Sequence, residues 1–342
     1  MIGSRKSKKR RKRQRFFTMI TTFFIILLIF TAGYSLFVYR SFQKTLDTVH
    51  EPLEDREISE KRTSQPVLEK KHPFSVLLLG VDERKNDKGR SDTIIVLAVN
   101  PDRNSVEMIS IPRDTKTEMV GKGKEDKINH AYAFGGINMA LQSVENLLDI
   151  PIDYYIKVNM EGFQDIVDAV GGIQVDNQLD FVYEGTHFKK GSLTLNGQDA
   201  LKYSRMRKLD PRGDFGRQER QRKVIQGVIK KGASLSSLWK YQEIFYALGE
   251  NVRTNLTFNE MKDIQKRYKD AAHNITQIEV KGTSQKMNGI YYFIVADDEK
   301  KRIRKLLRTQ LDLENLAELR EMDTSSHSFY GINLNEYSFQ TR

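Results

Sequence analysis

The fold is decided by residues 74–111, which contain the apolar runs FSVLLLG (74–80), TIIVLAVN (93–100) and SVEMISI (105–111). Gly80 ends the first run, and Asn100-Pro101-Asp102 separates the second run from the third. Short, continuous apolar runs bounded by such turn signals are typical of buried strands. These residues therefore predict three buried strands.

Downstream of these runs, apolar residues recur with helical spacing, and the helical segments are interrupted by short strand-like ones. Strands and helices that alternate along a chain are typical of an α/β layered domain. The spacing predicts helices at 137–148, 160–170, 197–203, 215–231, 237–249, 257–272 and 297–310, and strands at 153–159, 274–280 and 290–295.

The N-terminus has a different composition. Residues 5–15 (RKSKKRRKRQR) contain nine basic residues of a chain whose formal net charge is +11, so the remainder is close to neutral. The uncharged run at 16–39 is 24 residues long, and as a helix it would reach roughly 36 Å, more than a ~30 Å hydrocarbon core. The basic residues before it predict a single-pass membrane helix with a cytoplasmic tail at 1–15 and the rest of the chain outside the cell.

Three other interpretations fit this N-terminus less well. A cleaved signal peptide has a shorter apolar region, a nucleic-acid-binding tail would not adjoin an apolar span, and a buried soluble helix would not follow nine charges. Residues 40–72 are polar and predict an extracytoplasmic stalk, followed by a catalytic domain at 73–320 and a loose tail at 321–342. The chain has no cysteine, which excludes disulfides and thiolate chemistry.

A pair of aspartates flanks the first two predicted strands. Asp82 follows the end of the first strand and Asp92 lies at the start of the second. Adjacent strands could bring both carboxylates to one edge of the sheet, where they would suit a divalent cation, Mg²⁺ or Mn²⁺, shared with substrate phosphates. The alternative is that these are ordinary loop aspartates that make turns or helix caps.

Arginines form two further candidate clusters. One is Arg113 within SIPRDT, just past the third strand, which alone could be an ordinary ion pair with Asp114. The other lies between 205 and 220, where Arg205 and Arg207 would project the same way from an extended segment and Asp214 could cap the next helix. Arginines in the first turns of a helix oppose its dipole, but they suit a docked phosphate. A solvated basic face is the alternative.

These motifs together resemble the LytR–CpsA–Psr family of cell-wall ligases. The core of the resemblance covers residues 73–232, and a short piece at 251–257 (NVRTNLT) follows. It is carried by seven motifs in order, LLLGVDER (77–84), GRSDTIIVLAVNP (89–101), SIPRDT (110–115), KINHAYAFGG (127–136), PIDYYIKVNMEGFQDIVDAVGGI (151–173), LNGQDALKYSRMRK (195–208) and GDFGRQERQ (213–221). The sequence around DPRGDFGRQ (210–218) is most similar to that of the wall teichoic acid transferases of bacilli.

The resemblance implies a three-layer α/β domain with a central mixed sheet flanked by helices. It also implies an apolar cavity for a polyprenyl tail, with a mouth lined by arginines that bind pyrophosphate. The residues carried over fall into four groups: catalytic Asp82, Asp92, Arg113, Arg205 and Arg217; pyrophosphate-binding Arg90, Arg113, Arg205, Arg207, Arg217 and Gln218; orienting Asp214; and metal-binding Asp82 and Asp92. Arg84, Arg220 and Asn129 are second-rank candidates.

The activity that the resemblance implies is phosphoryl transfer. An anionic glycopolymer, expected to be wall teichoic acid, would move from a polyprenyl-pyrophosphate carrier to the C6 hydroxyl of peptidoglycan N-acetylmuramic acid. Expected partners are the lipid-linked polymer, peptidoglycan and membrane lipid, with no nucleic acid. Either aspartate could be the metal ligand or the general base. The alternatives are a pyrophosphatase that uses water at the same site, and a membrane-bound regulator of cell-envelope genes.

Overall fold

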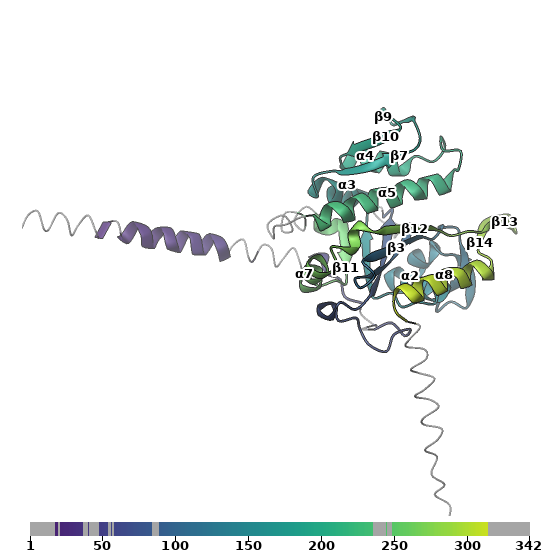
Figure 1. Cartoon of the computed structure of the whole chain (residues 1–342), viewed down its shortest axis with the longest axis horizontal. Helices are drawn as coiled ribbons and strands as arrows, with labels where there is room; N and C mark the ends of the chain where they lie inside the picture. Colours follow the sequence, from purple (N-terminus) through teal and green to yellow (C-terminus); the bar gives the residue numbers. More distant parts are fainter. Residues whose placement is uncertain are drawn as a thin grey trace, which may run out of the picture. The chain divides into compact units, whose positions relative to one another are not determined.

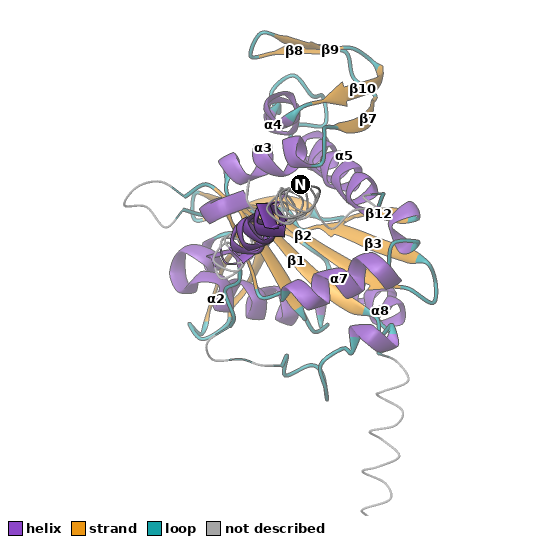
Figure 2. Cartoon of the chain, turned by 90° about the vertical axis from the view of Figure 1, so that its left-hand side faces the viewer, coloured by secondary structure: helices purple, strands orange, loops and turns teal. Residues whose placement is uncertain are grey.

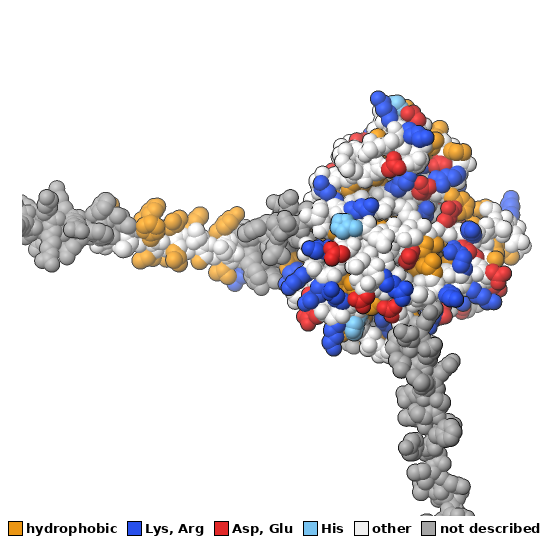
Figure 3. Space-filling model, viewed as in Figure 1, with side chains coloured by type: hydrophobic (Ala, Val, Ile, Leu, Met, Phe, Trp, Pro, Cys, Tyr) orange, Lys and Arg blue, Asp and Glu red, His pale blue; other side chains and the backbone are white. Residues whose placement is uncertain are grey.

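The computed structural model describes residues 18–19, 21–36, 40, 48–53, 56, 58–83, 89–234, 244 and 248–313. The chain divides into two units, Met1–Thr48 and Val49–Arg342. Residues 21–36 of the first unit are helical, and their large apolar side chains are exposed; Figure 3 shows them in orange. No described helix is both long enough and apolar enough to cross a membrane. The predicted span at 16–39 lies in part outside the described residues.

A six-stranded mixed sheet forms the centre of the second unit, in the order β11-β6-β1-β2-β3-β12 (Figure 2). The three predicted central strands are confirmed as β1 (Phe74–Val81), β2 (Ser91–Asn100) and β3 (Ser105–Ser110). They pair antiparallel to one another. The sheet also contains β6 (Tyr154–Val158) and β12 (Ile275–Glu279), which are parallel to β1 and β3 respectively, and β11 (Val252–Thr254), which is antiparallel to β6.

Both faces of this sheet are buried, which explains why its strands are continuous apolar runs. Alternate residues of β1 enter different cores, because successive side chains of a strand point to opposite faces. Leu77 and Leu79 belong to the core that also holds α2 (His130–Leu148) and α8 (Asp297–Gln310). Phe74 and Val76 belong to the opposite core, against α7 (Phe258–Arg267) and the second half of α5 (Asp214–Ala233). The expected central mixed sheet flanked by helices is therefore confirmed.

A third core lies beside the sheet (Figure 1). It is formed by α3 (Met160–Ala169), α4 (Gly197–Arg205) and one side of α5, together with two small antiparallel pairs. Those pairs are β7 (Ile173–Asn177) with β10 (Gly191–Leu195), and β8 (Phe181–Tyr183) with β9 (Thr186–Phe188). Two hairpins complete the unit, β4 (Lys116–Met119) with β5 (Lys124–Lys127) and β13 (Thr283–Met287) with β14 (Ile290–Ile294).

The remaining sequence predictions have mixed outcomes. The strands expected at 153–159, 274–280 and 290–295 are confirmed as β6, β12 and β14, and six of the expected helices are present as α2, α3, α4, α5, α7 and α8. The helix expected at 237–249 and the C-terminal tail at 321–342 fall almost entirely outside the described residues.

The segment at 49–72, expected as part of a stalk, belongs to the second unit and packs against the rest of it. Arg56 forms a bidentate ion pair with Glu145 of α2 at 2.6 and 2.7 Å, and Arg62 contacts Asp153 at 2.6 Å. Leu68 is buried in the second core. The compact unit thus begins at residue 49, which lies before the predicted domain boundary at 73.

Candidate active site

The topology of the sheet gathers the first candidate residues at one edge. The strands β1, β3, β6 and β12 run parallel, so their C-terminal ends meet there, together with the start of the antiparallel strand β2. Asp82 follows β1, Arg90 and Asp92 lie at the start of β2, and Arg113 follows β3. We refer to this edge as the rim.

A β-bulge sets the position of Asp92. Gly80 pairs with Thr93 and Val81 with Ser91, so Asp92 is the extra residue on β2. Bulges reorient a side chain and are common beside active sites. The turn between the strands needs a glycine, because Gly89 has a φ of +70° and an added Cβ would lie 2.5 Å from the carbonyl oxygen of Asp82. Residues 84–88, which include the candidate Arg84, lie outside the described part of the chain.

The rim contains a carboxylate–guanidinium pair. Arg113 donates from Nη1 to Asp92 Oδ2 at 2.8 Å, and Asn129 donates from Nδ2 to the other oxygen of Asp92 at 3.4 Å. Arg113 also lies 3.9 Å from Asp114, which is paired with Lys127 at 2.7 Å. Both Asp92 and Arg113 are partly exposed, so a substrate can reach them.

A second cluster is built on the N-terminus of α5. Arg217 contacts Asp214 through Nε at 2.9 Å and Nη2 at 2.8 Å, and Gln218 donates to Asp214 at 2.9 Å. Arg207 lies 3.6 Å from the same carboxylate. Burial alone would raise the pKa of Asp214, but Arg217, Gln218 and Arg207 outweigh it and hold the pKa below its ordinary value. Asp214 therefore stays charged and fixes these side chains, as the orienting role requires.

The structure corrects three expectations about this region. The residue that caps α5 is Gly213, so Asp214 lies inside the helix and does not cap it. Arg205 is the last residue of α4 rather than part of an extended segment. Its side chain is exposed and close enough to Tyr183 to lower the pKa of that phenol, although burial raises it overall. Among the described residues, the side chains that contact the Asp214 carboxylate are those of Arg217, Gln218 and Arg207, and not that of Arg205.

Arg220 has a structural role. Its guanidinium group is buried against Asp210 and donates to the carbonyl oxygens of Tyr203 and Met206. These bonds fix the loop between α4 and α5 that carries Arg207. Gly216 is required beside this pair, because an added Cβ would lie 1.9 Å from a carboxylate oxygen of Asp210. Arg220 is thus occupied within the protein and unsuited to binding phosphate.

The two clusters are connected through the β14 strand. The ring of Phe215, next to Asp214, lies 5.8 Å from the ring of Phe293. The backbone N–H of Phe293 donates to the carbonyl oxygen of Asp114 at 2.9 Å. Phe293 of β14 therefore contacts both the start of α5, next to Asp214, and the segment that carries Arg113, so one residue links the two clusters.

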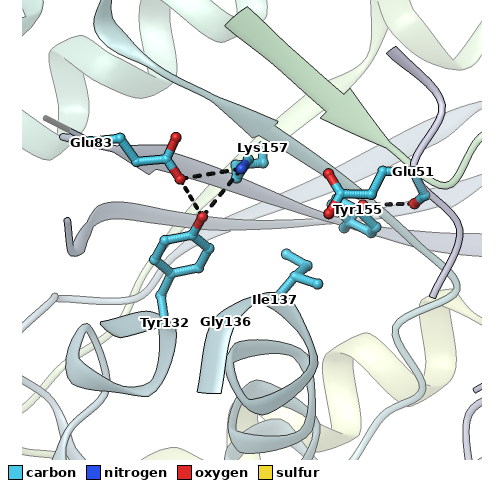
Figure 4. A pocket seen from close by; sticks show the side chains of 7 residues that line it. All are labelled: Glu51, Glu83, Tyr132, Gly136, Ile137, Tyr155 and Lys157. Carbon is cyan, nitrogen blue, oxygen red and sulfur yellow. Dashed lines mark hydrogen bonds and ion pairs between the residues drawn. The ribbon is translucent and has the colours of Figure 1, made fainter. Parts of the chain in front are cut away.

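A third feature beside the rim was missed from the sequence. A hollow of about 270 Å³ is lined by residues of α2 and β6, by Glu83 just after β1, and by Glu51 in the segment before β1 (Figure 4). Tyr132 donates to Glu83, and the Nζ atom of Lys157 lies 3.2 Å from Glu83 and 3.2 Å from the hydroxyl of Tyr132. Its lining mixes charged with aromatic and aliphatic side chains, unlike the apolar cavity expected for a prenyl tail. Tyr132 and Lys157 both lie within motifs of the family resemblance.

The rim offers oxygen ligands for a divalent cation. Within the described residues, no three His, Asp or Glu side chains come together as a metal site. However, the Oδ1 atom of Asn129 is buried without a hydrogen-bond partner, and its amide lies against Asp92. A hard cation such as Mg²⁺ is usually bound by few protein carboxylates, and substrate phosphates supply further ligands. Asp82, Asp92 and Asn129 carry the oxygen donors that such an ion takes, and Asn129 lies against Asp92.

Comparisons with known proteins agree with this geometry. Residues 36–309 match the LytR_cpsA_psr family. The chain is 52% identical over 282 residues to the polyisoprenyl-teichoic acid–peptidoglycan teichoic acid transferase TagU of Bacillus subtilis strain 168, covering 82% of this chain and 91% of TagU.

Two solved structures are also similar. The crystal structure of a transcriptional regulator from Enterococcus faecalis has a TM-score of 0.68 at 39% identity, covering 80% of this chain and 100% of that one. TagT bound to LIIa-WTA has a TM-score of 0.68 at 32% identity, covering 77% of this chain and 100% of TagT. The chain belongs to the LytR_cpsA_psr family and is an enzyme.

Proposed function

We propose that this enzyme is a phosphotransferase that moves an anionic glycopolymer, wall teichoic acid, from a polyprenyl-pyrophosphate carrier to the C6 hydroxyl of N-acetylmuramic acid in peptidoglycan. The observation that supports it best is the pair of carboxylate–guanidinium clusters, Asp92 with Arg113 and Asp214 with Arg217, which are linked through Phe293. Fixed guanidinium groups bind phosphate oxygens in a forked geometry. The names of the relatives TagU and TagT bound to LIIa-WTA support teichoic acid as the polymer.

The proposed step is a displacement at phosphorus. The C6 hydroxyl oxygen forms a bond to the phosphorus that carries the polymer, and the bond from that phosphorus to the bridging oxygen breaks. Polyprenyl phosphate leaves with the bonding electron pair, and the hydroxyl proton passes to a carboxylate, Asp82 or Asp92. The pyrophosphate linkage supplies the driving force, so no nucleotide is required.

The arginines stabilise the negative charge that spreads over the transferring phosphoryl group. Such transfers depend mainly on positioning and charge neutralisation rather than on covalent chemistry by side chains. Arg113 and Arg217 are suited to this because Asp92 and Asp214 hold them before substrate arrives. Arg90, Arg205 and Arg207 are exposed around the same loops and would contact the outer phosphate oxygens.

A bound Mg²⁺ or Mn²⁺ would neutralise phosphate charge at Asp82, Asp92 and Asn129. We also place the enzyme at the cell membrane, with residues 16–39 as a single span, the basic tail in the cytoplasm and the catalytic unit outside. This placement rests on the uncharged run and the nine basic residues before it. It would bring the active site to the side of the membrane where peptidoglycan lies.

Product analysis tests the proposal. The full-length chain is reconstituted in vesicles with a synthetic lipid-linked donor, radiolabelled in its polymer, and with peptidoglycan oligomers. We expect the label to appear in a phosphodiester at C6 of muramic acid. Release of free phosphorylated polymer with no peptidoglycan-linked product would instead identify a pyrophosphatase.

A further inference from the structure

The hollow that holds Glu83, Tyr132 and Lys157 adjoins the rim. Glu83 directly follows Asp82 at the end of β1, and Lys157 on β6 pairs with Leu79 of β1. Figure 4 shows the side chains of Glu83, Lys157 and Tyr132 pointing toward one another at one end of the hollow, with Tyr155 and Glu51 at the other. Its position at the rim makes it a neighbour of the proposed reaction centre.

The charges in this hollow are paired with one another. Glu83 lies 3.2 Å from Lys157, and Glu51 lies 3.7 Å from Arg253. No surplus positive charge remains among these four groups to bind a pyrophosphate, in contrast to the arginine clusters. The hollow therefore suits an uncharged ligand that can both donate and accept hydrogen bonds.

The aromatic residues give the hollow both an apolar surface and a fixed donor. Burial and, after it, the neighbouring Glu83 raise the pKa of Tyr132 well above its ordinary value, so its hydroxyl stays protonated; it donates to Glu83 and accepts from Lys157. The rings of Tyr132 and Tyr155 and the side chain of Ile137 supply apolar contact. A sugar ring presents the same mixture, with apolar C–H faces and hydroxyl groups at its edge.

The backbone of α2 is distorted at this wall. Gly136 has φ 63° and ψ −151°, a conformation that is open essentially only to glycine, and it interrupts the helix. An added Cβ at Gly136 would meet no atom within 4 Å, so packing does not require a glycine there. Backbone strain of this kind is common at ligand sites, where glycine lets the main chain approach a ligand.

We propose that this hollow is the subsite for the acceptor glycan. It would hold one uncharged, hydroxylated sugar ring of peptidoglycan between the Tyr132 ring and Ile137, with Glu83 and Lys157 bonding its hydroxyl or acetamido groups. The sugar's reacting hydroxyl would then face the rim at Asp82. The inference rests on the proposed function, because it assigns the second substrate of that reaction.

Kinetics of full-length variants test it. Tyr132→Phe and Lys157→Met each remove one bonding group, and we expect the KM for peptidoglycan oligomers to rise about tenfold, which corresponds to about 1.4 kcal/mol. The KM for the lipid-linked donor should stay within twofold of wild type. Tyr154→Phe is the matched control, because Tyr154 is also buried and donates to a glutamate, Glu260, but lines a different hollow.

An unchanged glycan KM in both variants would overturn the inference. A rise in the donor KM would also overturn it, because the hollow would then hold the lipid carrier. If wild type transfers nothing, the proposed function fails, and binding of a peptidoglycan oligomer that contains N-acetylmuramic acid, without donor, decides the inference separately. Saturation-transfer NMR should detect that binding to the wild-type chain and a loss of it in Lys157→Met; no binding to wild type would overturn the inference.

Discussion

Replacing Arg217 with alanine should nearly abolish transfer while leaving the protein folded. Arg217 is 12% exposed and is held by two contacts to Asp214 at 2.9 and 2.8 Å. A preorganised donor of this kind typically contributes about 10²–10³-fold to the rate, equivalent to about 3–4 kcal/mol. Asp214 would keep its bond from Gln218 and its neighbour Arg207, so we expect a stability loss of only about 1 kcal/mol.

Two nearby arginines provide controls for Arg217. The side chain of Arg212 is 54% exposed and pairs with Glu219, which also contacts Lys223, so Arg212→Ala should change neither rate nor stability appreciably. Arg220→Ala removes the partner of buried Asp210 and should lower the free energy of unfolding by about 3–5 kcal/mol. The three variants thus separate a lost phosphate contact from a lost structural one.

The assay combines the initial rate of transfer from the labelled donor with urea unfolding followed by circular dichroism. We expect Arg217→Ala to be slow and stable, Arg212→Ala to match wild type, and Arg220→Ala to unfold at lower urea. An Arg217→Ala protein that is folded and turns over at a near-normal rate would refute the assignment of Arg217.

Three further predictions concern other parts of the site. Gly216→Ala should lower the urea midpoint by an amount equivalent to about 3 kcal/mol, because the new Cβ would overlap Asp210; an unchanged midpoint would contradict the tight contact. Asp214→Asn should be less stable than wild type at neutral pH, and the gap should close as the pH falls below ~4, since a carboxylate with a depressed pKa stabilises only while ionised; a pH-independent gap would argue against this. EDTA should lower the transfer rate, and Mg²⁺ or Mn²⁺ should restore it; a rate insensitive to EDTA would remove the metal from the proposal.

The central sheet could be predicted because its strands are buried on both faces. Burial on two faces demands continuous apolar runs, and FSVLLLG and TIIVLAVN are such runs. The small pairs β7–β10 and β8–β9 were missed, because β8 and β9 are only three residues long and β7 and β10 mix polar with apolar residues. The packing of residues 49–72 was missed for another reason. It depends on ion pairs such as Arg56 with Glu145, which are 89 residues apart and leave no local pattern.

The candidate site could likewise be predicted only in part from the sequence. Asp82, Asp92 and Arg113 flank consecutive strands, so their meeting at one edge followed from local order. The role of Arg220 could not be predicted, because an arginine that binds phosphate and one that donates to buried carbonyl groups look alike in sequence. The cluster of Glu83, Tyr132 and Lys157 requires three separate segments to converge, which only the tertiary structure reveals.

The distribution of charge on the catalytic unit differs from what the net charge of +11 of the whole chain suggests. Basic and acidic side chains are interspersed on the face visible in Figure 3. The strong basicity of the chain therefore does not appear there as a single broad field, as expected if much of it belongs to residues 5–15. We therefore expect the proposed anionic donor to bind through the local arginine clusters rather than by long-range attraction.

The central claim is that guanidinium groups from separate loops act on one pyrophosphate, and a double-mutant cycle measures this directly. The transfer rates of Arg113→Ala, Arg217→Ala and the double variant are compared with wild type at saturating acceptor. We predict a coupling free energy of about 1 kcal/mol or more, because both side chains would contact the same phosphoryl group. Effects that add within about 0.5 kcal/mol would mean that the two arginines act independently, and they would contradict a shared site.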